Sequence, residues 1–539
     1  MPGDDYDYVV VGGGSAGCIA AAELAGDPDV SVLLLECGEP AEHNPETLRA
    51  DGYKDAFAND RLIWERFSTH QPGCGGRRIF MGSGRGLGGS GSVNGMVYTR
   101  GAREDFSEWP EGWRWEDVAP HFQALESRLR IRRRSETAFT EASIAAAEVA
   151  GFRRKPDLND GDLSGVLGYE WMNYERDSRR SSYVAFIKDQ PCSNLVIETG
   201  ARARRILVDD ARRVTGIEYQ RDGASHSVRL RREAILCAGA LETPKLLMLS
   251  GIGPSDELES QGIQPILDLP GVGQNLHDHP NVTLFFLGKR PVDCNHPQLY
   301  GFHRANPHSD LPAGQSDTCY VFYPARSSMR EAMLRLLPGI LLPHFLYGVR
   351  PLRAAIRGLV KFAFALPPVR RFVERLYGIV LILGKPRSRG RLGLVSTDAR
   401  EQARLDPAYF EDPVDMETMV RGVELARKIG GAEPLTEWGS TELTPGKRSA
   451  SRAKVARWIA KNAMTTYHFA GTCRMGGDPN AVVDRFLRVR GIEGLRIADA
   501  SVIPTTPVSA LNAPTMLIGY RVAQFIRAAS TRAGSGLPS

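Results

Sequence analysis

The sequence lacks an uninterrupted apolar run of about 18 residues, the length a membrane-spanning helix requires. Cysteine is scarce, with eight in 539 residues and no C-x-x-C pair, so neither a disulfide framework nor a metal site is indicated. The first six residues leave no room for a charged and then apolar leader before the fold begins. These absences lead us to expect a cytoplasmic protein that does not cross a membrane.

The overall charge is also small. It is +5, with 24% charged and 42% hydrophobic residues, which is ordinary for a globular protein. No nucleic-acid recognition motif accompanies the basic residues, so a nucleic-acid partner is not expected. At about 150 residues a domain the length fits three or four domains, but two larger interleaved domains fit it equally well.

A glycine-rich turn between a buried strand and a helix opens the chain. Residues 7–11, DYVVV, predict the strand, and Gly12, Gly14 and Gly17 form a G-x-G-x-x-G motif directly after it. Gly12 permits a tight turn, Gly14 lets the backbone approach a pyrophosphate, and Gly17 lets the helix lie close on the strand. Ser15 begins the expected helix, whose first N–H groups favour anions. The pattern predicts a dinucleotide-binding site.

A carboxylate follows the second expected strand. Residues 30–35 read as that strand, and Glu36 ends it. An acid in this place accepts hydrogen bonds from a ribose diol, which favours FAD or NAD over NADP. The motif alone does not choose between FAD and NAD.

A second glycine-rich loop lies between residues 82 and 105. It contains Gly88, Gly89, Asn94 and Gly95, and it offers many backbone N–H groups with little side-chain bulk. Such a loop can wrap a large planar or phosphorylated ligand, although a flexible linker has a similar composition. The apolar, aromatic segment that follows it argues against a linker.

Several motifs in a fixed order resemble one enzyme family, the glucose-methanol-choline (GMC) oxidoreductases. They are the turn at Gly12, LGGSGSVNG at 87–95, GALETPKLLMLSGIG at 239–253, VGQNLHDH at 272–279 and DASVIP at 499–504. The resemblance runs from residue 6 to residue 528 and weakens between 290 and 390. It implies an α/β fold in which a Rossmann-like FAD-binding domain is interleaved with an α+β substrate-binding domain on an antiparallel sheet.

The resemblance also implies domain boundaries. We expect a discontinuous FAD-binding domain of residues 1–150, 192–290 and 466–539. Residues 151–191 and 291–465 then form the substrate-binding domain.

Cofactor-binding residues follow from the same resemblance. It places the backbone of Ala203 near the adenine and Asp499 near the ribityl-pyrophosphate. Some members attach FAD through a histidine of the glycine-rich loop, where this chain has Val93, so we expect non-covalent FAD. The full expected set is Gly12, Gly14, Ser15, Gly17, Glu36, Gly88, Gly89, Asn94, Gly95, Ala203, Asp499, Ala500, Pro514 and Thr515.

Two residues near the C-terminus are the catalytic candidates. A single histidine among aromatic residues is more often structural, but His468 lies in a segment that resembles the family's active-site strand. Asn512 follows 44 residues later, where the family has its second catalytic residue, His or Asn. A neutral imidazole suits a base that takes an alcohol proton as hydride leaves the carbon. By the resemblance, the helix from Pro514 to Phe525 points its N-terminus at the flavin pyrimidine ring.

The resemblance therefore implies FAD-dependent oxidation of an alcohol to an aldehyde or ketone, with His468 as base. The electron acceptor is oxygen or a quinone-like carrier. An FAD-containing lyase and a non-redox flavin-binding scaffold stay open as alternatives. Choline-oxidising and aryl or aliphatic alcohol-oxidising members are the most similar in motif. Choline itself is disfavoured, because residues 290–325 show no carboxylate that matches a quaternary ammonium site.

The segment 326–391 is unusually basic, with 14 Lys or Arg against two Glu, a net charge of +12. Arg350, Arg353, Arg357 and Lys361 share one face of an expected helix, and apolar residues share the other. One interpretation is a lid on the substrate domain with its basic face in solvent. The other is an amphipathic platform that contacts an anionic membrane or admits an apolar substrate.

Overall fold

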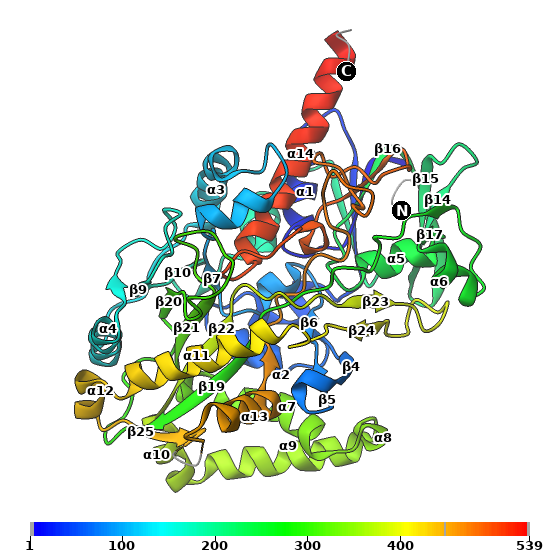
Figure 1. Cartoon of the computed structure of the whole chain (residues 1–539). Coiled ribbons are helices and arrows are strands. Elements are labelled where there is room, and N and C mark those ends of the chain that lie inside the picture. Colours follow the sequence, from blue (N-terminus) through cyan, green and yellow to red (C-terminus); the bar gives the residue numbers. More distant parts are fainter. Residues whose placement is uncertain (1–4, 447–448, 536–539) are drawn as a thin grey trace.

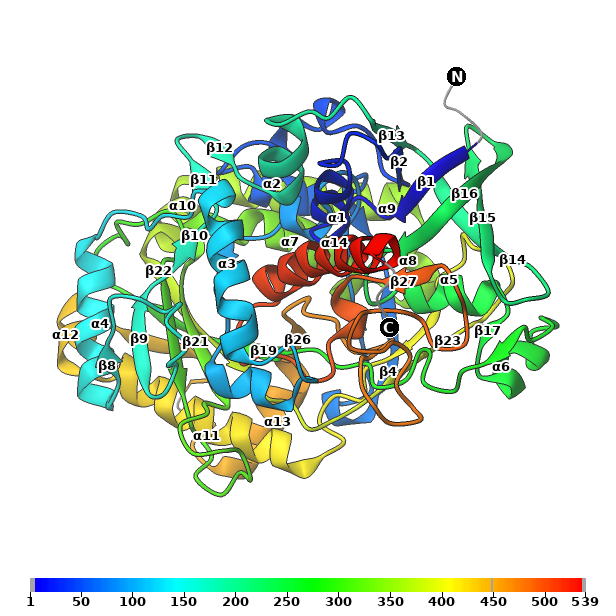
Figure 2. The same ribbon diagram turned by 90° about the horizontal axis from the view of Figure 1, so that it is seen from above.

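The computed structural model describes residues 5–446 and 449–535, whose longer strands form two large sheets (Figure 1, Figure 2). Figure 2 shows the two sheets side by side, one toward the left and one toward the right. The chain passes between them several times, so each sheet is built from segments far apart in the sequence. The fold class expected from the sequence is confirmed.

The first sheet has a parallel core that an antiparallel hairpin extends. Its strands are β1 (Asp5–Val11), β2 (Val32–Glu36), β13 (Leu195–Thr199), β14 (Arg202–Val208), β15 (Val214–Arg221), β16 (Ala224–Leu236) and β27 (Leu495–Ile497). The order is β13-β2-β1-β16-β15-β14, and β27 pairs with the end of β16. All pairs are parallel except those of β15 with β14 and β16. The carboxyl ends of β1, β2 and β16 meet at one edge, the usual place for a ligand in such sheets.

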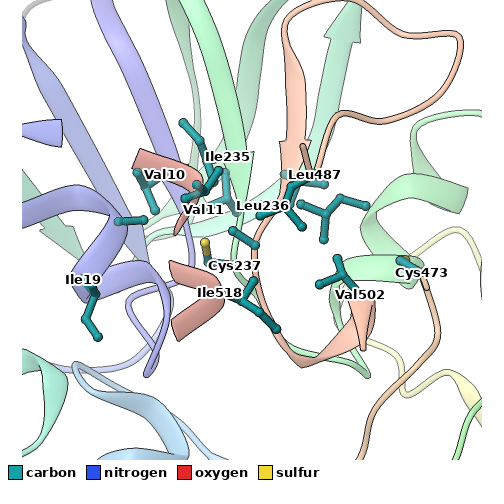
Figure 3. Packing of buried hydrophobic residues seen from close by; sticks show 14 of the residues in the cluster. Val10, Val11, Ile19, Ile235, Leu236, Cys237, Cys473, Leu487, Val502 and Ile518 are labelled. Atoms are coloured by element: carbon teal, nitrogen blue, oxygen red, sulfur yellow. The ribbon is translucent and has the colours of Figure 1, made fainter. Parts of the chain in front are cut away.

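Two helices pack on this parallel core, α1 (Gly17–Leu24) and α14 (Asn512–Ser535). Figure 3 shows Val10 and Ile235 of the sheet in one buried cluster with Ile518 of α14. A Cβ on Gly519 would lie 2.4 Å from the carbonyl oxygen of Ala16. Glycine at this point therefore lets the first turns of α14 approach the start of α1.

The second sheet is antiparallel, apart from its short edge strand. Its strands are β8 (Arg153–Arg154), β9 (Val166–Tyr169), β19 (Pro280–Leu287), β20 (Leu299–His303), β21 (Thr318–Pro324), β22 (Leu376–Leu383), β25 (Thr441–Thr444) and β26 (Met464–Thr465). The order is β25-β19-β22-β21-β20-β9-β8, and β26 pairs with β19. Helices α4 (Ala138–Ala150), α11 (Pro413–Gly430), α12 (Glu433–Trp438) and α13 (Arg452–Asn462) contribute buried residues to the same core.

Shorter elements complete the fold. The other helices outside the 329–375 segment are α2 (Tyr53–Ala58), α3 (Trp115–Leu129), α5 (Thr243–Leu249) and α6 (Ser255–Ser260). The strand pairs are β3 (Ile63–Trp64) with β6 (Ser83–Gly84), β4 (Phe67–Gln71) with β5 (Arg77–Phe80), β7 (Val97–Tyr98) with β10 (Trp171–Met172), β11 (Tyr174–Glu175) with β12 (Ser178–Arg179), β17 (Ile252–Gly253) with β18 (Leu267–Asp268), and β23 (Arg391–Gly393) with β24 (Arg404–Asp406).

Two segments that we expected in the FAD-binding domain belong, in the structure, to the second sheet and its core. Residues 280–287 were assigned to the FAD-binding domain, but they form β19 near one edge of the second sheet. Residues 138–150 were assigned there too, but α4 packs in the second core through Phe139 and Ile144. No local pattern marks the place where the chain crosses between the sheets, because an apolar strand suits either core.

Four helices, α7 (Met329–Leu341), α8 (His344–Tyr347), α9 (Arg350–Ala365) and α10 (Pro367–Arg375), connect β21 to β22. In Figure 1, α8, α9 and α10 run along the lower edge of the molecule. Within the described residues, no helix combines the length and the apolar character needed to cross a membrane.

The orientation of α9 differs from the expectation of a basic face in solvent. Arg353 pairs with Glu65 and Arg357 with Asp60, so both point toward the body of the protein. The reason is the position of two carboxylates, Asp60 in the turn after α2 and Glu65 directly after β3, which draw these two guanidinium groups inward. The exposed part of α9 therefore includes apolar side chains.

Candidate active site

One cavity of about 910 Å³ is lined by residues of both sheets. The first sheet contributes Val11 and Glu36 at the ends of β1 and β2. The second contributes Thr283 of β19 and Val380 of β22. The cavity therefore extends from the ligand-binding edge of the parallel sheet to the face of the antiparallel one.

The glycines of the first turn have separate structural roles. Gly12 has a φ of +103°, and a Cβ there would lie 2.5 Å from the carbonyl oxygen of Cys237. A Cβ on Gly17 would lie 1.8 Å from the carbonyl oxygen of Gly12, so the helix rests directly on the turn. At Gly14 the nearest described atom to a Cβ is 4.0 Å away, and this residue lines the cavity. Gly12 also lines the cavity, but of the three only Gly14 has open space at its Cβ position, while Gly12 and Gly17 shape the backbone.

The helix after the turn begins later than expected, at Gly17 instead of Ser15. Ser15 instead lines the cavity, and its hydroxyl donates to Oδ1 of Asn512 at 2.8 Å. Because Ser15 precedes the helix, its side chain is free to bridge the turn and the start of α14. The bridge joins residues 497 positions apart in the sequence.

The carboxylate of Glu36 connects the two glycine-rich loops. Its Oε2 accepts from the N–H of Gly13 at 2.8 Å. Its Oε1 accepts from Gly38 at 2.7 Å and from Gly86 at 3.0 Å. Glu36 is buried and lines the cavity. A carboxylate has about four lone-pair positions, so three backbone bonds leave one acceptor position for a ligand hydroxyl.

The second glycine-rich loop packs on the first. Gly88 has a φ of +85°, and it does not line the cavity. Gly89 has a φ of +52°, and a Cβ there would lie 2.8 Å from Cα of Gly14. Gly95 lines the cavity, and no described atom lies within 4 Å of its ideal Cβ position. Of the three, Gly95 is the open position.

Asn94 is held by contacts within the protein. Its Oδ1 accepts from Nη1 of Arg179 at 2.8 Å and from the N–H of Met96 at 3.0 Å. Arg179 also donates to the backbone oxygens of Gly91 and Asn94, and it is fully buried. This arginine fixes the loop around Asn94, which lines the cavity.

Asp499 organises the start of α5. Its Oδ2 accepts from the N–H of Gly239 at 2.8 Å and from the hydroxyl of Thr243 at 2.6 Å. Its Oδ1 accepts from the N–H of Ser501 at 2.8 Å. Thr243 is the first residue of α5, and its bond to Asp499 ties the helix start to that carboxylate. Asp499, Ala500 and Ala203 all line the cavity.

His468 follows the short strand β26. Its backbone N–H donates to Oδ1 of Asp278 at 2.7 Å, and the hydroxyl of Tyr409 donates to the other oxygen of that carboxylate at 2.5 Å. The preceding residue, Tyr467, has a φ of +64°, a left-handed conformation that bulky residues rarely adopt. Burial lowers the pKa of His468 to about 4, so its imidazole is neutral at neutral pH.

A second histidine contacts the ring of His468 and bears on which of its nitrogens carries the proton. Nδ1 of His279 lies 3.0 Å from Nδ1 of His468, and the two rings meet edge to face. One of these nitrogens must carry the shared proton. If Nδ1 of His468 donates it, Nε2 of His468 keeps a lone pair, as a base requires. His468 lines the cavity, and no hydrogen bond to its Nε2 is formed within the described residues.

Sequence reasoning used the HDH segment only for the resemblance and missed this contact. His279 is fully buried, and its Nε2 has no hydrogen-bond partner among the described residues. Burial holds the pKa of His279 well below its usual range. Both rings are therefore neutral, which makes a shared proton between them favourable.

Asn512 is the first residue of α14, two residues before the start expected at Pro514. Its Oδ1 is engaged by Ser15, whereas its buried Nδ2 has no partner within residues 5–446 and 449–535. Thr515 lines the cavity and Pro514 does not. A buried amide without a partner costs free energy, so Nδ2 is suited to an acceptor supplied by a ligand.

A further carboxyl in the cavity was not anticipated. Glu170 follows β9, is buried, and lines the cavity. Neither of its oxygens has a hydrogen-bond partner in the described part of the chain. Burial raises the pKa of Glu170 to about 8, so the group is largely neutral at pH 7. Glu170 lies outside residues 290–325, the region in which the family resemblance would place a carboxylate for a quaternary ammonium. It also belongs to none of the sequence motifs.

Models of the N-terminal and C-terminal parts of one family, GMC oxidoreductase, match residues 6–281 and 386–519. The chain belongs to the GMC oxidoreductase family. It is 32% identical to an alcohol dehydrogenase [acceptor] of Pseudomonas putida, over 97% of this chain and 95% of that one. It is also 32% identical to an oxygen-dependent choline dehydrogenase of Paraburkholderia phymatum, over 100% and 95%. A crystal structure of pyridoxine 4-oxidase from Mesorbium loti superposes with a TM-score of 0.83 at 29% identity, covering 97% and 99%.

GMC oxidoreductases bind FAD, and the cavity fits that cofactor. Gly14 and Gly95 line the cavity with space beside their backbone for a ligand. Glu36 has one unused acceptor position, and Nδ2 of Asn512 has no acceptor among the described residues. No group of three or more His, Cys, Asp or Glu that could hold a metal ion occurs in the described residues. The protein is an FAD-dependent oxidoreductase.

Proposed function

We propose that this enzyme oxidises an alcohol to an aldehyde or ketone, with His468 as the base that takes the hydroxyl proton. When bound, FAD supplies the hydride acceptor, N5 of its flavin ring. The supporting observation is that one cavity is lined by a neutral imidazole and by an amide N–H group that has no partner among the described residues. General-base help of this kind accelerates proton transfer by roughly 10² to 10⁴.

The proposed base works through the histidine pair. Nδ1–H of His468 donates to His279, so the lone pair on Nε2 faces the cavity and accepts the alcohol proton. The resulting imidazolium keeps its Nδ1–H bonded to a neutral acceptor. His279 is therefore a positioning residue in this proposal, since it acts through His468.

Asn512 is proposed to hold the alcohol oxygen. Ser15 fixes the amide by donating to Oδ1, which leaves Nδ2–H to donate to the oxygen from which the proton departs. This contact orients the carbon–hydrogen bond and does not compete for the proton. It also explains why an amide can serve here in place of a second titrating group.

The test is anaerobic mixing of the purified holoenzyme with a panel of primary, secondary and aryl alcohols. Loss of the yellow flavin absorbance, followed by its return with oxygen or a quinone, supports the proposal and identifies the acceptor. An enzyme whose flavin stays oxidised with every alcohol argues for the alternatives. A lyase would still form product, whereas a scaffold would not.

The cofactor is proposed to be non-covalent. Val93 lines the cavity in the loop where a histidine linkage would form, and an aliphatic side chain cannot make that bond. Acid denaturation should release all yellow colour into the supernatant. Colour that stays with the precipitate would show a covalent bond formed elsewhere.

The two sheets also suggest which part of the protein binds the cofactor and which part binds the substrate. We assign FAD binding to the parallel sheet and its helices, and substrate binding to the antiparallel sheet with β19 and α4 included.

A further inference from the structure

Large apolar side chains that face solvent gather on one surface. Among the described residues, thirteen such side chains are exposed, and nine of them belong to the helical segment 340–372. We call these nine the apolar face. They are Ile340, Leu341, Phe345, Val349, Leu352, Leu359, Phe362, Leu366 and Phe372. Phe345, Leu359 and Phe362 are 79%, 69% and 66% exposed, so these three side chains lie largely in solvent.

On α9 the apolar face is a continuous stripe. Leu352, Leu359 and Phe362 recur at intervals of seven and three residues, which places them on one side of the helix, and Leu366 directly follows its last residue. The opposite side carries Arg353 and Arg357, which bind Glu65 and Asp60. A helix of a water-soluble surface normally shows the reverse arrangement.

The orientation is fixed by buried charge pairs. Arg335 of α7 is buried and pairs with both Asp60 and Glu65 at 2.8 Å. Arg353 and Arg357 of α9 bind the same two carboxylates at 2.8 Å. Rotating α9 to hide the stripe would leave these carboxylates without two of their partners. These ion pairs therefore keep the apolar stripe exposed, so it is available to contact an apolar partner.

Positive charge without an acidic partner accompanies the face. Arg350, Lys361, Arg370 and Arg371 are exposed, and none forms an ion pair with another described residue. Further along the basic segment, by contrast, Arg387 pairs with Asp310 and Asp412. The unpaired cations thus concentrate on α9 and α10, beside the apolar stripe. Cationic side chains around an apolar helix face match an anionic lipid surface.

The apolar face also meets the cavity. Met329, Met333, Leu336 and Ile340 of α7 line the cavity wall. Ile340 is 74% exposed as well, so the cavity lining reaches the surface at the apolar face. A molecule that lies among acyl chains would meet an apolar passage there.

We propose that the apolar face seats on an anionic membrane and that an alcohol with a long alkyl chain enters the cavity past Ile340. The docking part stands on the surface alone. The substrate part rests on the proposed function. A second copy of the chain fits the face less well, because a symmetric contact would bring the unpaired cations of both copies together.

The first experiment measures vesicle binding of the full-chain holoenzyme by co-sedimentation. Vesicles of phosphatidylcholine alone are compared with vesicles that also contain phosphatidylglycerol, at low and at high salt. We expect binding to the mixed vesicles that weakens as salt rises, since screening reduces the attraction. Protein that stays in the supernatant in every mixture would overturn the docking.

Matched variants show which surface binds. The double variant Leu359→Ser and Phe362→Ser should lower the vesicle partition coefficient by about tenfold or more, because two fully inserted apolar side chains are lost. Val395→Ser, at a similarly exposed valine outside the apolar face, should change nothing. Equal binding by the double variant and the parent would place the contact elsewhere. Light scattering that shows a dimer which this double variant dissociates would assign the face to a second copy and overturn the proposal.

The entry route is tested by kinetics on the same variants. We expect kcat/KM for alkyl alcohols to rise with chain length, more steeply with mixed vesicles present, and this rise to vanish in the double variant. Rates on a short, water-soluble alcohol should stay unchanged, which also shows that the variant is folded. No chain-length preference in the parent would overturn the route. Failure to oxidise any alcohol would sink the proposed function while leaving vesicle binding to be judged by itself.

Discussion

Two regions of the molecule treat apolar and polar groups in opposite ways. At the turns around Gly14 and Gly89, two chain segments meet backbone to backbone, and polar N–H groups lie beside the cavity. On α9, Arg353 and Arg357 point inward beside the buried Val360, while Leu359 and Phe362 face solvent. The first region excludes side chains so that a polar ligand can approach. The second exposes apolar side chains to water, which is energetically unfavourable. We interpret both regions as sites for a partner, a cofactor in one case and, as proposed above, an apolar phase in the other.

The largest expected effect on the cavity side comes from His468→Ala. Without the base, the rate of flavin reduction by an alcohol should fall by roughly 10² to 10⁴, with FAD still bound. Anaerobic stopped-flow absorbance measures that rate. The matched control is His43→Ala, at an exposed histidine that does not line the cavity, which should behave as the parent. Reduction at the parental rate would remove His468 from the proposed chemistry.

Alanine substitutions can distinguish a glycine that shapes the turn, Gly17, from a glycine that faces the ligand, Gly14. Gly17→Ala places a Cβ 1.8 Å from a carbonyl oxygen, so the backbone must shift, and overpacking of this kind costs about 1 to 3 kcal/mol. Gly14→Ala meets no described atom closer than 4.0 Å, so the apoprotein should unfold at the parental temperature and lose affinity for FAD.

Thermal unfolding of each variant with and without FAD separates the two. Gly17→Ala should lower the transition temperature in both conditions, and Gly14→Ala only with FAD present. If the two variants behave alike, the assignment of separate roles to these glycines is wrong.

Asn512→Ala should have a smaller effect than the loss of the base. One oriented hydrogen bond is removed while His468 stays, so flavin reduction should slow by about tenfold, which corresponds to about 1.4 kcal/mol. The same stopped-flow assay applies. A companion variant, Ser15→Ala, leaves Nδ2 in place and should have a weaker effect. An Asn512→Ala enzyme as fast as the parent would make the residue a helix-start residue only.

The smallest effect is expected from pH near neutrality. Burial lowers the pKa of His468 to about 4, so the neutral base form is fully populated above pH 6 and is lost as the pH falls through 4. Flavin reduction should therefore be flat between pH 6 and 8 and decline only in acid. A rate that rises tenfold for each pH unit across the neutral range would show that the base titrates there and that the imidazole is not held neutral by burial.

The sequence anticipated much of the cofactor side of the cavity and little of the substrate side. The glycine spacing at 12–17 and the acid at 36 are local patterns, and the structure brings both to the cavity edge. His468 and Asn512 came from family resemblance, and they line the same cavity. Pro514, Gly17 and Gly88 were also expected at the cofactor, but they do not line the cavity. Gly17 and Gly88 shape the backbone instead, and a motif cannot distinguish that role from contact with a ligand.

By itself, the sequence determined the family, the two-sheet fold class, the turn that only glycine can form at Gly12, and the amphipathic composition of α9. The turn and the composition of α9 depend on residues close together in the chain, and the family and its fold class on several short motifs in a fixed order. Only the tertiary structure decided that His279 contacts His468, that Glu170 has no hydrogen-bond partner among the described residues of the cavity, and that Leu359 and Phe362 of α9 face solvent. Each of these depends on a partner distant in the sequence, because burial and the nearest opposite charge are set by the packed fold.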